Sequence, residues 1–440
     1  MRSSNRLTRN NHPAWLRGVD ILLVLFAITV RFSQAGVAAT SYHSGVTDLW
    51  GGAVESIALR TDGTVWTWGW GEYGILGNGH GLPMNDPSTQ YDSWVPFQVL
   101  GANGFGHLNS ITAIAGGERH NAALDANGEV WTWGWNYFGQ LGIGTTCTGM
   151  NTPDCMGTTP VKVPGFTNVK AIASRGYHTL ALKKDGTVWA WGYNYSGRLG
   201  DGTNTDRHSP VPVGGLTGHG QVLAISGGGD VSAALMEDHS LMAWGNNEYG
   251  AVGNAITSTV GQWVPAPVSQ STGLTTTIAI ATGWDHMVAL DGNGNVWTWG
   301  DNGDGELGNG KIGVEFSSAV PLKVSGMSGV IGVSAGDGST VVLKSNGTVW
   351  AWGSLRHGDG SAYPLGTTPV QVAGIDHVTL VRARDWHVLA LKSDGTVWAW
   401  GSNQRGECGN NTVGGNTDTP VQVLFPDFFE TFLYLPITLK

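Results

Sequence analysis

A five-residue motif, Val-Trp-Thr/Ala-Trp-Gly, recurs seven times in the 440-residue chain and constrains its fold more than any other feature. In the fourth copy the motif is weakened to Leu241-Met242-Ala243-Trp244-Gly245. The closing glycines lie at positions 69, 134, 192, 245, 300, 353 and 401, so successive repeats are 48 to 65 residues apart. A period near fifty residues with strand-like content is typical of propellers and repeat arrays. One closed body of seven repeats is therefore expected, although the length alone would suggest two or three domains.

Each repeat is predicted to contain four short strands. An apolar run before a Gly-rich turn, such as residues 111–117, precedes a strand of small apolar residues such as 178–182. An Asn-Gly or Asp-Gly pair then marks a two-residue hairpin, because both residues tolerate the positive φ of that turn. The fourth repeat has the poorer pair Asp238-His239. The motif is the third strand, and its alternation puts both tryptophans on one sheet face, where they can fill the gap between neighbouring blades. A Pro-Val strand such as 211–213 forms the outer edge, where proline is tolerated.

The repeats contain three patterns in a fixed order: Gly-x-x-His-(x)3-Leu, then Asp-Gly-x-Val-Trp-x-Trp-Gly, then Asn-x-x-Gly-Gln-Leu-Gly. The third pattern is clearest at residues 136–142 and 194–200. It resembles the regulator of chromosome condensation repeat over residues 46–424, and the chain is identified as an exported, bacterial-type member of that family. The resemblance implies an all-β fold, a seven-bladed β-propeller of four-stranded blades. The family histidine is present at His120, His178, His286 and His387 and replaced at Glu55, Val231 and Ser339. A histidine absent from three of seven blades is interpreted as a structural hydrogen-bonding residue.

The chain divides into three predicted regions. Residues 1–39 are interpreted as a signal peptide, because a basic segment precedes a ten-residue apolar run at 21–30 and small residues end at Ala39. The run is too short to span a bilayer, and Arg31 ends it. Residues 40–424 form the propeller, and residues 425–440 are an apolar tail, either an edge strand or plug, or a docking or sorting tail. Secreted or cell-surface localisation is expected, with no membrane span after signal removal.

The charge balance bears on the class of partner. The chain carries a net charge of −10, although its first 39 residues hold five arginines and one aspartate. The propeller is therefore more acidic than the whole chain. A surface of that sign repels phosphate backbones, so nucleic-acid binding is not expected.

The cysteines and acidic motifs predict little chemistry. Cys147 and Cys155 lie eight residues apart in an insertion and are predicted to form a disulfide in an oxidising compartment. Cys408 occupies a repeat position held elsewhere by leucine and is interpreted as a buried apolar thiol. The run 301–306 fails the calcium-loop pattern at its third and twelfth positions. Three glycosylation sequons, at Asn194, Asn346 and Asn410, arise from the repeat itself. No metal site, cofactor motif or catalytic constellation is found, so the chain is predicted not to be an enzyme.

The turns after the Trp-Gly pairs differ between early and late repeats. The early ones are aromatic and supply the candidate binding residues Trp70, Tyr73, Trp135, Tyr137, Phe138, Tyr193, Tyr195 and Tyr249. The later ones carry charged or polar residues: Asp301, Asp304, Arg356, His357, Gln404 and Arg405. If these turns share one face, half of it is aromatic, as interface hot spots and sugar-stacking platforms are. The alternative is that the rings pack onto neighbouring blades. Trp284 and Trp386 are expected on the opposite rim.

Three functions are compatible with this pattern. The first is an exported protein-binding propeller, an interaction scaffold or extracellular inhibitor, that uses the aromatic-rich loop face. Nuclear family members exchange nucleotide on a small GTPase, a role that a signal peptide disfavours, whereas secreted members include a β-lactamase inhibitor. The second is a carbohydrate-binding surface protein, and the third a hydrolase or lyase with its site in the channel. Photoreceptor members rely on Gly-Trp-Arg-His turns, to which only Gly283-Trp284-Asp285-His286 comes near.

Overall fold

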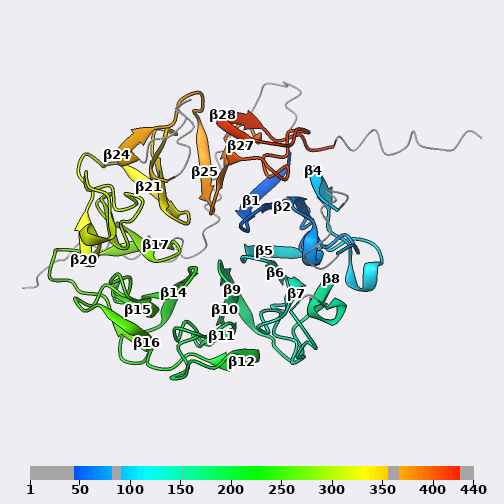
Figure 1. Cartoon of the computed structure of the whole chain (residues 1–440), viewed down its shortest axis with the longest axis horizontal. Helices are drawn as coiled ribbons and strands as arrows, with labels where there is room; N and C mark the ends of the chain where they lie inside the picture. Colours follow the sequence, from blue (N-terminus) through cyan, green and yellow to red (C-terminus); the bar gives the residue numbers. More distant parts are fainter. Residues whose placement is uncertain (1–43, 82–90, 151, 355–365, 427–440) are drawn as a thin grey trace, which may run out of the picture. The chain divides into compact units, whose positions relative to one another are not determined.

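In a computed structural model, residues 44–81, 91–150, 152–354 and 366–426 are described. They form seven four-stranded antiparallel sheets arranged as the blades of a ring (Figure 1), which confirms the predicted seven-bladed β-propeller. Each sheet consists of four consecutive strands, the first bordering the centre and the fourth lying at the outside. The predicted signal peptide (1–39), the charged turn with Arg356 and His357, and tail residues 427–440 lie outside the described residues.

The strand bounds follow the predicted four-strand repeat. Blades one to three contain β1 (Val46–Gly51), β2 (Glu55–Arg60), β3 (Val65–Gly69), β4 (Ser93–Gln98), β5 (Ile111–Gly116), β6 (His120–Asp125), β7 (Val130–Trp135), β8 (Met156–Lys162), β9 (Val169–Ser174), β10 (His178–Lys183), β11 (Val188–Gly192) and β12 (Arg207–Pro212). Blades four to seven contain β13 (Val222–Gly227), β14 (Val231–Met236), β15 (Leu241–Asn247), β16 (Ser258–Pro267), β17 (Thr277–Thr282), β18 (His286–Asp291), β19 (Val296–Gly300), β20 (Ser318–Lys323), β21 (Val330–Ala335), β22 (Ser339–Lys344), β23 (Val349–Gly353), β24 (Gly366–Gln371), β25 (Val378–Ala383), β26 (His387–Lys392), β27 (Val397–Ser402) and β28 (Asn416–Gln422). Short 3-10 turns are η1 (Glu72–Gly74), η2 (Ala102–Gly104), η3 (Pro153–Cys155) and η4 (Val314–Phe316).

The second tryptophan of each motif joins its blade to the preceding one. All seven are fully buried: Trp68, Trp133, Trp191, Trp244, Trp299, Trp352 and Trp400. Trp191 packs on Val130 and Val163 of the preceding blade, and its indole Nε1 donates to the Gln140 carbonyl oxygen at 2.9 Å. The same bond joins Trp133 to Ile75 at 2.8 Å. The indole thus contributes its large apolar area and satisfies its one polar atom at the same interface.

The last residue of the motif must be glycine because its backbone has a positive φ and lies close to a neighbouring turn. Gly192 has φ +106°, and a Cβ there would lie 2.4 Å from the Tyr177 carbonyl oxygen. Only glycine adopts this conformation without a clash. It therefore allows the end of the third strand to lie directly against the turn that precedes the second strand. In the fourth blade His239 takes the glycine's place in the hairpin with φ +64°, and the sheet of β13–β16 still forms.

The family histidines also join blades, which confirms the predicted structural role. The His120 Nε2 atom lies 2.8 Å from the Thr179 hydroxyl of the next blade, and His178 Nε2 lies 2.8 Å from the Ser232 hydroxyl. His387 closes the ring by the same contact, 2.8 Å from Ser56 of blade one. Burial lowers the pKa of His120 to about 3, so the ring stays neutral and hydrogen-bonded at ordinary pH.

The ring closes without strand exchange among the described residues. Blade seven consists of β25–β28 and blade one of β1–β4. Arg382 of β25 donates to the Leu49 carbonyl oxygen at 3.1 Å and to the Asp48 carboxylate at 2.9 Å. Phe425, directly after blade seven, packs edge-on against Trp66 and Trp68 of blade one. Side chains therefore hold the two ends of the propeller together.

The account of the blade interface predicts a difference between two tryptophans of one strand. Trp191→Phe should lower the free energy of unfolding by about 2 kcal/mol, because the Gln140 carbonyl loses its donor and the interface loses volume. Trp189→Phe is the matched control, since the half-buried Trp189 indole donates only to Thr187 of its own blade. Urea unfolding of both variants measures the difference. Equal losses would contradict the role of the inter-blade bond.

Candidate functional site

Two sets of connections lie at one end of the propeller, which we call the loop face. In every blade the second strand begins opposite the end of the third, as in the pairing of His286 with Gly300. The turns between first and second strands therefore share a face with the loops that follow the Trp-Gly pairs. The predicted placement of Trp284 and Trp386 on the opposite rim is wrong, because these residues precede β18 and β26 and lie on the loop face. The Asp-Gly and Asn-Gly hairpins form the other face.

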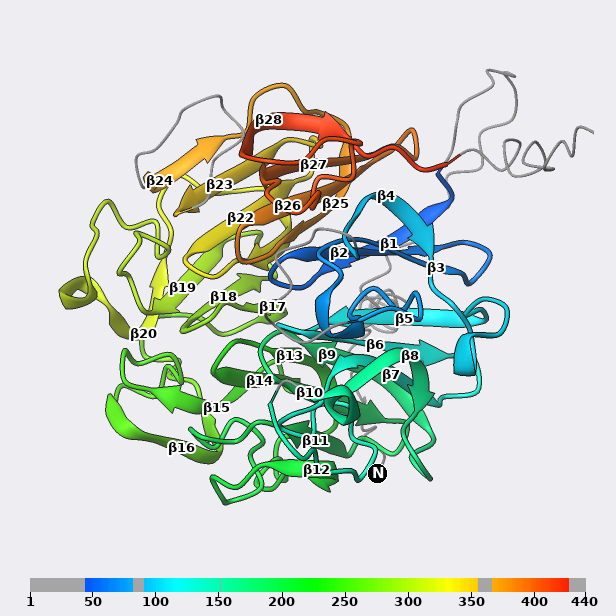
Figure 2. The same cartoon turned by 45° about the vertical axis from the view of Figure 1, so that its right-hand side comes forward.

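Aromatic side chains of the first three blades form a continuous group on the loop face. These blades, β1–β4, β5–β8 and β9–β12, are neighbours in Figure 2. Rings in contact run from Trp70 through Tyr73 and Trp135 to Tyr137 and Phe138, and on to Tyr177, Tyr193 and Tyr195. We call these eight residues the aromatic cluster. The centroids of contacting rings lie between 4.2 Å apart, for Phe138 and Tyr193, and 6.4 Å apart, for Tyr177 and Tyr193.

The structure brings together seven of the eight candidate binding residues. Tyr73 and Trp135 are buried and form the floor of the cluster, whereas Tyr195 is 70% exposed. Trp70, Tyr137, Phe138 and Tyr193 are half-buried. Tyr249 lies elsewhere, beside acidic residues, and the Glu248 charge raises its pKa. Some rings of the cluster thus pack onto neighbouring blades, while other rings are exposed to solvent.

Two residues of the cluster region were missed by sequence reasoning. Tyr177 immediately precedes His178 and packs on Trp135 and Phe138. The Arg119 guanidinium carbon lies 5.1 to 5.6 Å from the ring centroids of Trp70, Tyr73 and Trp135. Such an arrangement is a cation–π contact. Their place in the repeat could have identified both residues, since Arg119 and Tyr177 each directly precede a family histidine.

A disulfide holds one edge of the cluster. Cys147 and Cys155 are bonded, as predicted, with their Cα atoms 5.1 Å apart. Cys155 is buried beside Tyr73 and Trp135, and the loop between the two cysteines supplies the Met150 carbonyl oxygen that accepts a 2.8 Å hydrogen bond from Trp135 Nε1. The loop is therefore fixed over Trp135. Cys408, in contrast, is a buried free thiol at the leucine position, as predicted.

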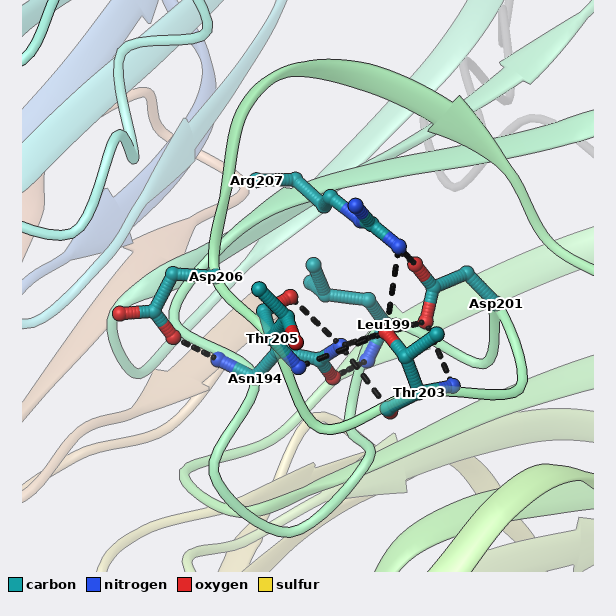
Figure 3. Close-up of polar contacts among 7 residues, drawn as sticks. All are labelled: Asn194, Leu199, Asp201, Thr203, Thr205, Asp206 and Arg207. Atoms are coloured by element: carbon teal, nitrogen blue, oxygen red, sulfur yellow. Dashed lines mark hydrogen bonds and ion pairs between the residues drawn. The ribbon is translucent and has the colours of Figure 1, made fainter.

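An asparagine clamps the loop that follows the Trp-Gly pair in blades two, three, four, five and seven, as Figure 3 shows for blade three. The Asn194 side-chain oxygen accepts from the Leu199 amide at 3.0 Å, while its nitrogen donates to the Thr203 and Thr205 carbonyls. Asp201 pairs with Arg207 across the same loop. Because Asn194 is fully buried, its sequon presents no accessible amide. Asn302 accepts from Leu307 in the same way, so the run 301–306 is another clamp. Among the described residues, no group of three His, Cys, Asp or Glu side chains is placed to hold a metal ion.

The centre of the ring contains a charged network that the sequence did not reveal. Arg175 of blade three donates to Asp385 of blade seven at 2.7 Å, and Arg384 donates to the Gly51 and Gly116 carbonyls of blades one and two. Burial raises the pKa of Glu55 and Glu118 well above the usual range, and the Asp385 charge adds to the effect. Three carboxyl groups thus converge, as the hydrolase alternative requires. Glu55 and Asp385 are buried and lie among arginines, whereas Glu118 is half-buried. The network ties several blades together.

The loops of blades four to six are acidic. Burial, with the neighbouring Asp230 and Asp301 charges, raises the pKa of Asp285 to about 7. Burial also raises the pKa of Asp337 to about 6 and that of Glu306 to about 8. The loop face therefore carries aromatic side chains on blades one to three and acidic ones on blades four to six. The sequence predicts a charged half that also includes basic residues, of which Arg356 and His357 lie outside the described residues.

A seven-bladed propeller with a variable loop face defines the class of this protein, and the comparisons define its family. A family model described as regulator of chromosome condensation (RCC1) repeat matches residues 62–124, 127–182, 185–235, 238–290 and 293–343. A second model of this repeat extends the matches to residues 385–407. The matches cover more than half of the chain. The chain belongs to the RCC1 repeat family.

Two plant proteins are similar in sequence over most of this chain. The ultraviolet-B receptor UVR8 of Arabidopsis thaliana is 32% identical over 310 residues, which cover 70% of this chain and 64% of that protein. The mitochondrial RCC1 domain-containing protein RUG3 of the same plant is 30% identical over 335 residues, covering 73% of this chain and 66% of that protein. The chain thus spans slightly less than two thirds of these relatives.

Solved structures agree on the fold. Human WBSCR16 superposes with a TM-score of 0.70 at 21% identity, covering 83% of this chain and 94% of that chain. Yeast RCC1 (Prp20), solved with Kap60, superposes with a TM-score of 0.69 at 20% identity, covering 90% of each chain. At this identity the likeness shows the propeller alone. In the described ranges, no helix has the length and apolar content needed to cross a membrane.

The raised pKa of Glu306 predicts a pH-dependent effect of one substitution. An unfolded glutamate titrates near 4.3, so between about pH 4.3 and 8 the folded state binds more protons and wild-type stability falls as pH rises. Glu306→Gln removes that loss and introduces the residue that blade two carries at the same position, Gln140. The variant should match wild type near pH 5 and exceed it by at least about 1 kcal/mol at pH 8. Chemical denaturation at the two pH values measures this, and a pH-independent difference would contradict the assignment.

Proposed function

We propose that this chain is an exported propeller that binds a protein partner through the loop face, with the aromatic cluster as its contact area. The observation that supports this most is the cluster itself. Aromatic rings provide large contact areas at low entropic cost and are enriched in interface hot spots. Exposed Tyr195 and half-buried Trp70, Tyr137, Phe138 and Tyr193 supply the accessible surface, while buried Tyr73 and Trp135 hold it rigid. Rigid contact groups reduce the ordering cost of binding.

The named relatives are consistent with a protein-binding role. Yeast RCC1 (Prp20) was solved bound to Kap60, and another study of it concerns its binding to Gsp1p and histones. We infer a partner of the same general class for this chain, without transferring those partners. The function requires no chemistry, so the chain is proposed to act as a scaffold or extracellular inhibitor and not as an enzyme.

Carbohydrate binding is the alternative that the same rings support, because aromatic faces stack on sugars as well as on protein side chains. The two functions differ in which ligand the cluster retains. A glycan signal that depends on the cluster would favour the alternative.

Paired variants on opposite faces test the proposed surface. Immobilised wild-type chain is exposed to culture medium, and the proteins that it retains are identified and their affinities measured. Tyr193→Ala with Tyr195→Ala should weaken binding at least about 30-fold, the effect of losing a hot spot. Phe105→Ala is the control, since Phe105 is 83% exposed and follows β4 on the opposite face. Equal binding by both variants, or glycan-array binding lost only in the tyrosine variant, would contradict the proposal.

The export part of the proposal has its own test. When the full chain is expressed in a secreting host, the protein in the medium should begin at Thr40, because Ala39 ends the small-residue segment after the apolar run. N-terminal sequencing identifies the cleavage point. Leu23→Arg with Leu25→Arg should abolish release, since charges interrupt the apolar run. Uncleaved wild-type chain retained in cells would count against export.

A further inference from the structure

Four interfaces between blades share one arrangement of hydrogen bonds, which we call the histidine link. In each link, a histidine Nε2 atom contacts a serine or threonine hydroxyl of the next blade, and that hydroxyl contacts a backbone carbonyl oxygen. Between blades two and three, His120 contacts Thr179 at 2.8 Å, and the Thr179 hydroxyl lies 3.4 Å from the Gln140 carbonyl oxygen. The Trp191 indole donates to the same oxygen at 2.9 Å. Links of the same form begin at His178, His286 and His387.

The carbonyl oxygen fixes the hydrogen positions in each link. Because a carbonyl can only accept, the Ser232 hydroxyl donates its single hydrogen to the Arg198 carbonyl oxygen at 2.8 Å. That hydroxyl must then accept from His178, whose Nε2 atom lies 2.8 Å away. Ser174, the second hydroxyl beside His120, also donates to a carbonyl, so it too accepts from Nε2. All four histidines are therefore the tautomer that carries its hydrogen on Nε2.

The other ring nitrogen, Nδ1, is left without a partner. In all four histidines this atom is buried and forms no hydrogen bond with the described residues. Glycines lie against it in two links. A Cβ on Gly117 would lie 2.4 Å from His120 Nδ1, and a Cβ on Gly283 would lie 2.2 Å from His286 Nδ1. A proton on Nδ1 would therefore create a charged, buried N–H group that has no acceptor, which is costly.

We propose that the histidine links form an acid-sensitive latch, which holds four interfaces while the imidazoles are neutral and releases them when Nδ1 is protonated. The imidazolium reaches an acceptor for its new N–H only by leaving the site toward water, which weakens the contact between two blades. The other three interfaces carry no such link, because Glu55, Val231 and Ser339 occupy the histidine position. Acid therefore acts on particular interfaces of the ring.

Two latched interfaces have special positions. His387 contacts Ser56 at 2.8 Å where blade seven meets blade one, at the closure of the ring. His120 joins blades two and three, across which the rings of Phe138 and Tyr193 have centroids 4.2 Å apart. Release of the first link weakens the closure, and release of the second loosens the aromatic cluster. The latch itself does not depend on what the loop face binds.

Charged groups beside the imidazoles add to the effect of burial. Burial lowers the pKa of all four histidines, and an arginine charge lowers it further: Arg384 at His120 and His387, Arg198 at His178, and Arg175 at His286. The pKa is about 3 for His120 and about 4 for His387. The Asp385 charge acts in the opposite direction at His387, as two backbone groups do at His286. Burial outweighs both.

The sign of the pH effect follows from these shifts. An unfolded histidine has a pKa near 6.5, so below about pH 6.5 the unfolded state binds more protons and the folded state loses stability as the pH falls. Carboxyl groups near the links respond in the opposite sense, because burial raises the pKa of Glu55, Glu118, Glu306 and Glu407. Variants that differ in one histidine separate the two contributions.

The test compares two histidine variants of the full chain. In His120→Gln the side-chain amide keeps a donor toward Thr179 but takes up no proton. His107→Gln is the matched control, because His107 is exposed in the loop after β4 on the opposite face. Urea unfolding followed by tryptophan fluorescence gives the unfolding equilibrium constant at pH 7 and pH 5. From pH 7 to 5 this constant should rise about 20-fold more in wild type and His107→Gln than in His120→Gln.

Two further results bear on the latch. An equal rise in wild type and in both variants would refute it, because the acid response would then belong to other groups. If His120→Gln does not fold, NMR of wild type labelled with 15N-histidine replaces it, and the four link histidines should be the neutral Nε2–H tautomer at pH 7 and at pH 5. A link histidine that carries its hydrogen on Nδ1 at pH 7, or that is protonated at pH 5 in the folded chain, would overturn the inference.

Discussion

Among the described residues, six of the seven interfaces between blades depend on one buried indole that packs on the preceding blade and donates a hydrogen bond to it. At the seventh interface, Trp400 packs on the preceding blade. The contact combines two requirements that usually conflict, because a large apolar group must enter the core while its N–H must be satisfied. A carbonyl at the end of the preceding blade's loop meets the second requirement, as Gln140 does for Trp191. Neighbouring histidine–hydroxyl contacts add a second polar link at four interfaces. The position of each blade relative to its neighbour is therefore set by apolar packing and hydrogen bonding at the same interface.

Because the indole and histidine contacts hold the blades together, the side chains of the loop face are free to differ between blades. In five blades the asparagine clamp fixes the loop from within, so its backbone is constrained while neighbouring side chains can differ. The first three blades carry aromatic residues and a disulfide in these loops, and the fifth carries Asp301 and Asp304. In the channel, Arg175 and Arg384 join several blades below this surface. The rigid floor and the variable rim are what an interaction surface requires.

The fold could be predicted because its determinants are periodic. The seven motifs, the hairpin pairs and the histidine positions all recur with the same spacing, which chance would rarely produce. The fourth sheet forms even though His239 stands where the other hairpins have glycine. Seven of the eight residues of the aromatic cluster could also be predicted, since they follow equivalent motifs, whereas Tyr177 precedes a family histidine and was missed. The burial of Tyr73 and Trp135 could not, because a repeat pattern does not say which ring of a cluster lies at the surface. The misplaced Trp284 and Trp386 show that strand order must be combined with hairpin geometry to assign a rim. Arg119 and the Arg175–Asp385 pair escaped detection because they are single substitutions, and 210 residues separate the members of the pair.

Hydrogen exchange of the indole N–H groups, followed by NMR with labelled tryptophan, tests the inter-blade bond most directly. Trp133, Trp191, Trp244 and Trp299, each bonded to a carbonyl of the preceding blade, should exchange only when the whole propeller unfolds. The indole of exposed Trp386 should exchange many times faster. Exchange of the buried indoles at a rate like that of Trp386 would contradict the claim that these bonds hold the blades in register.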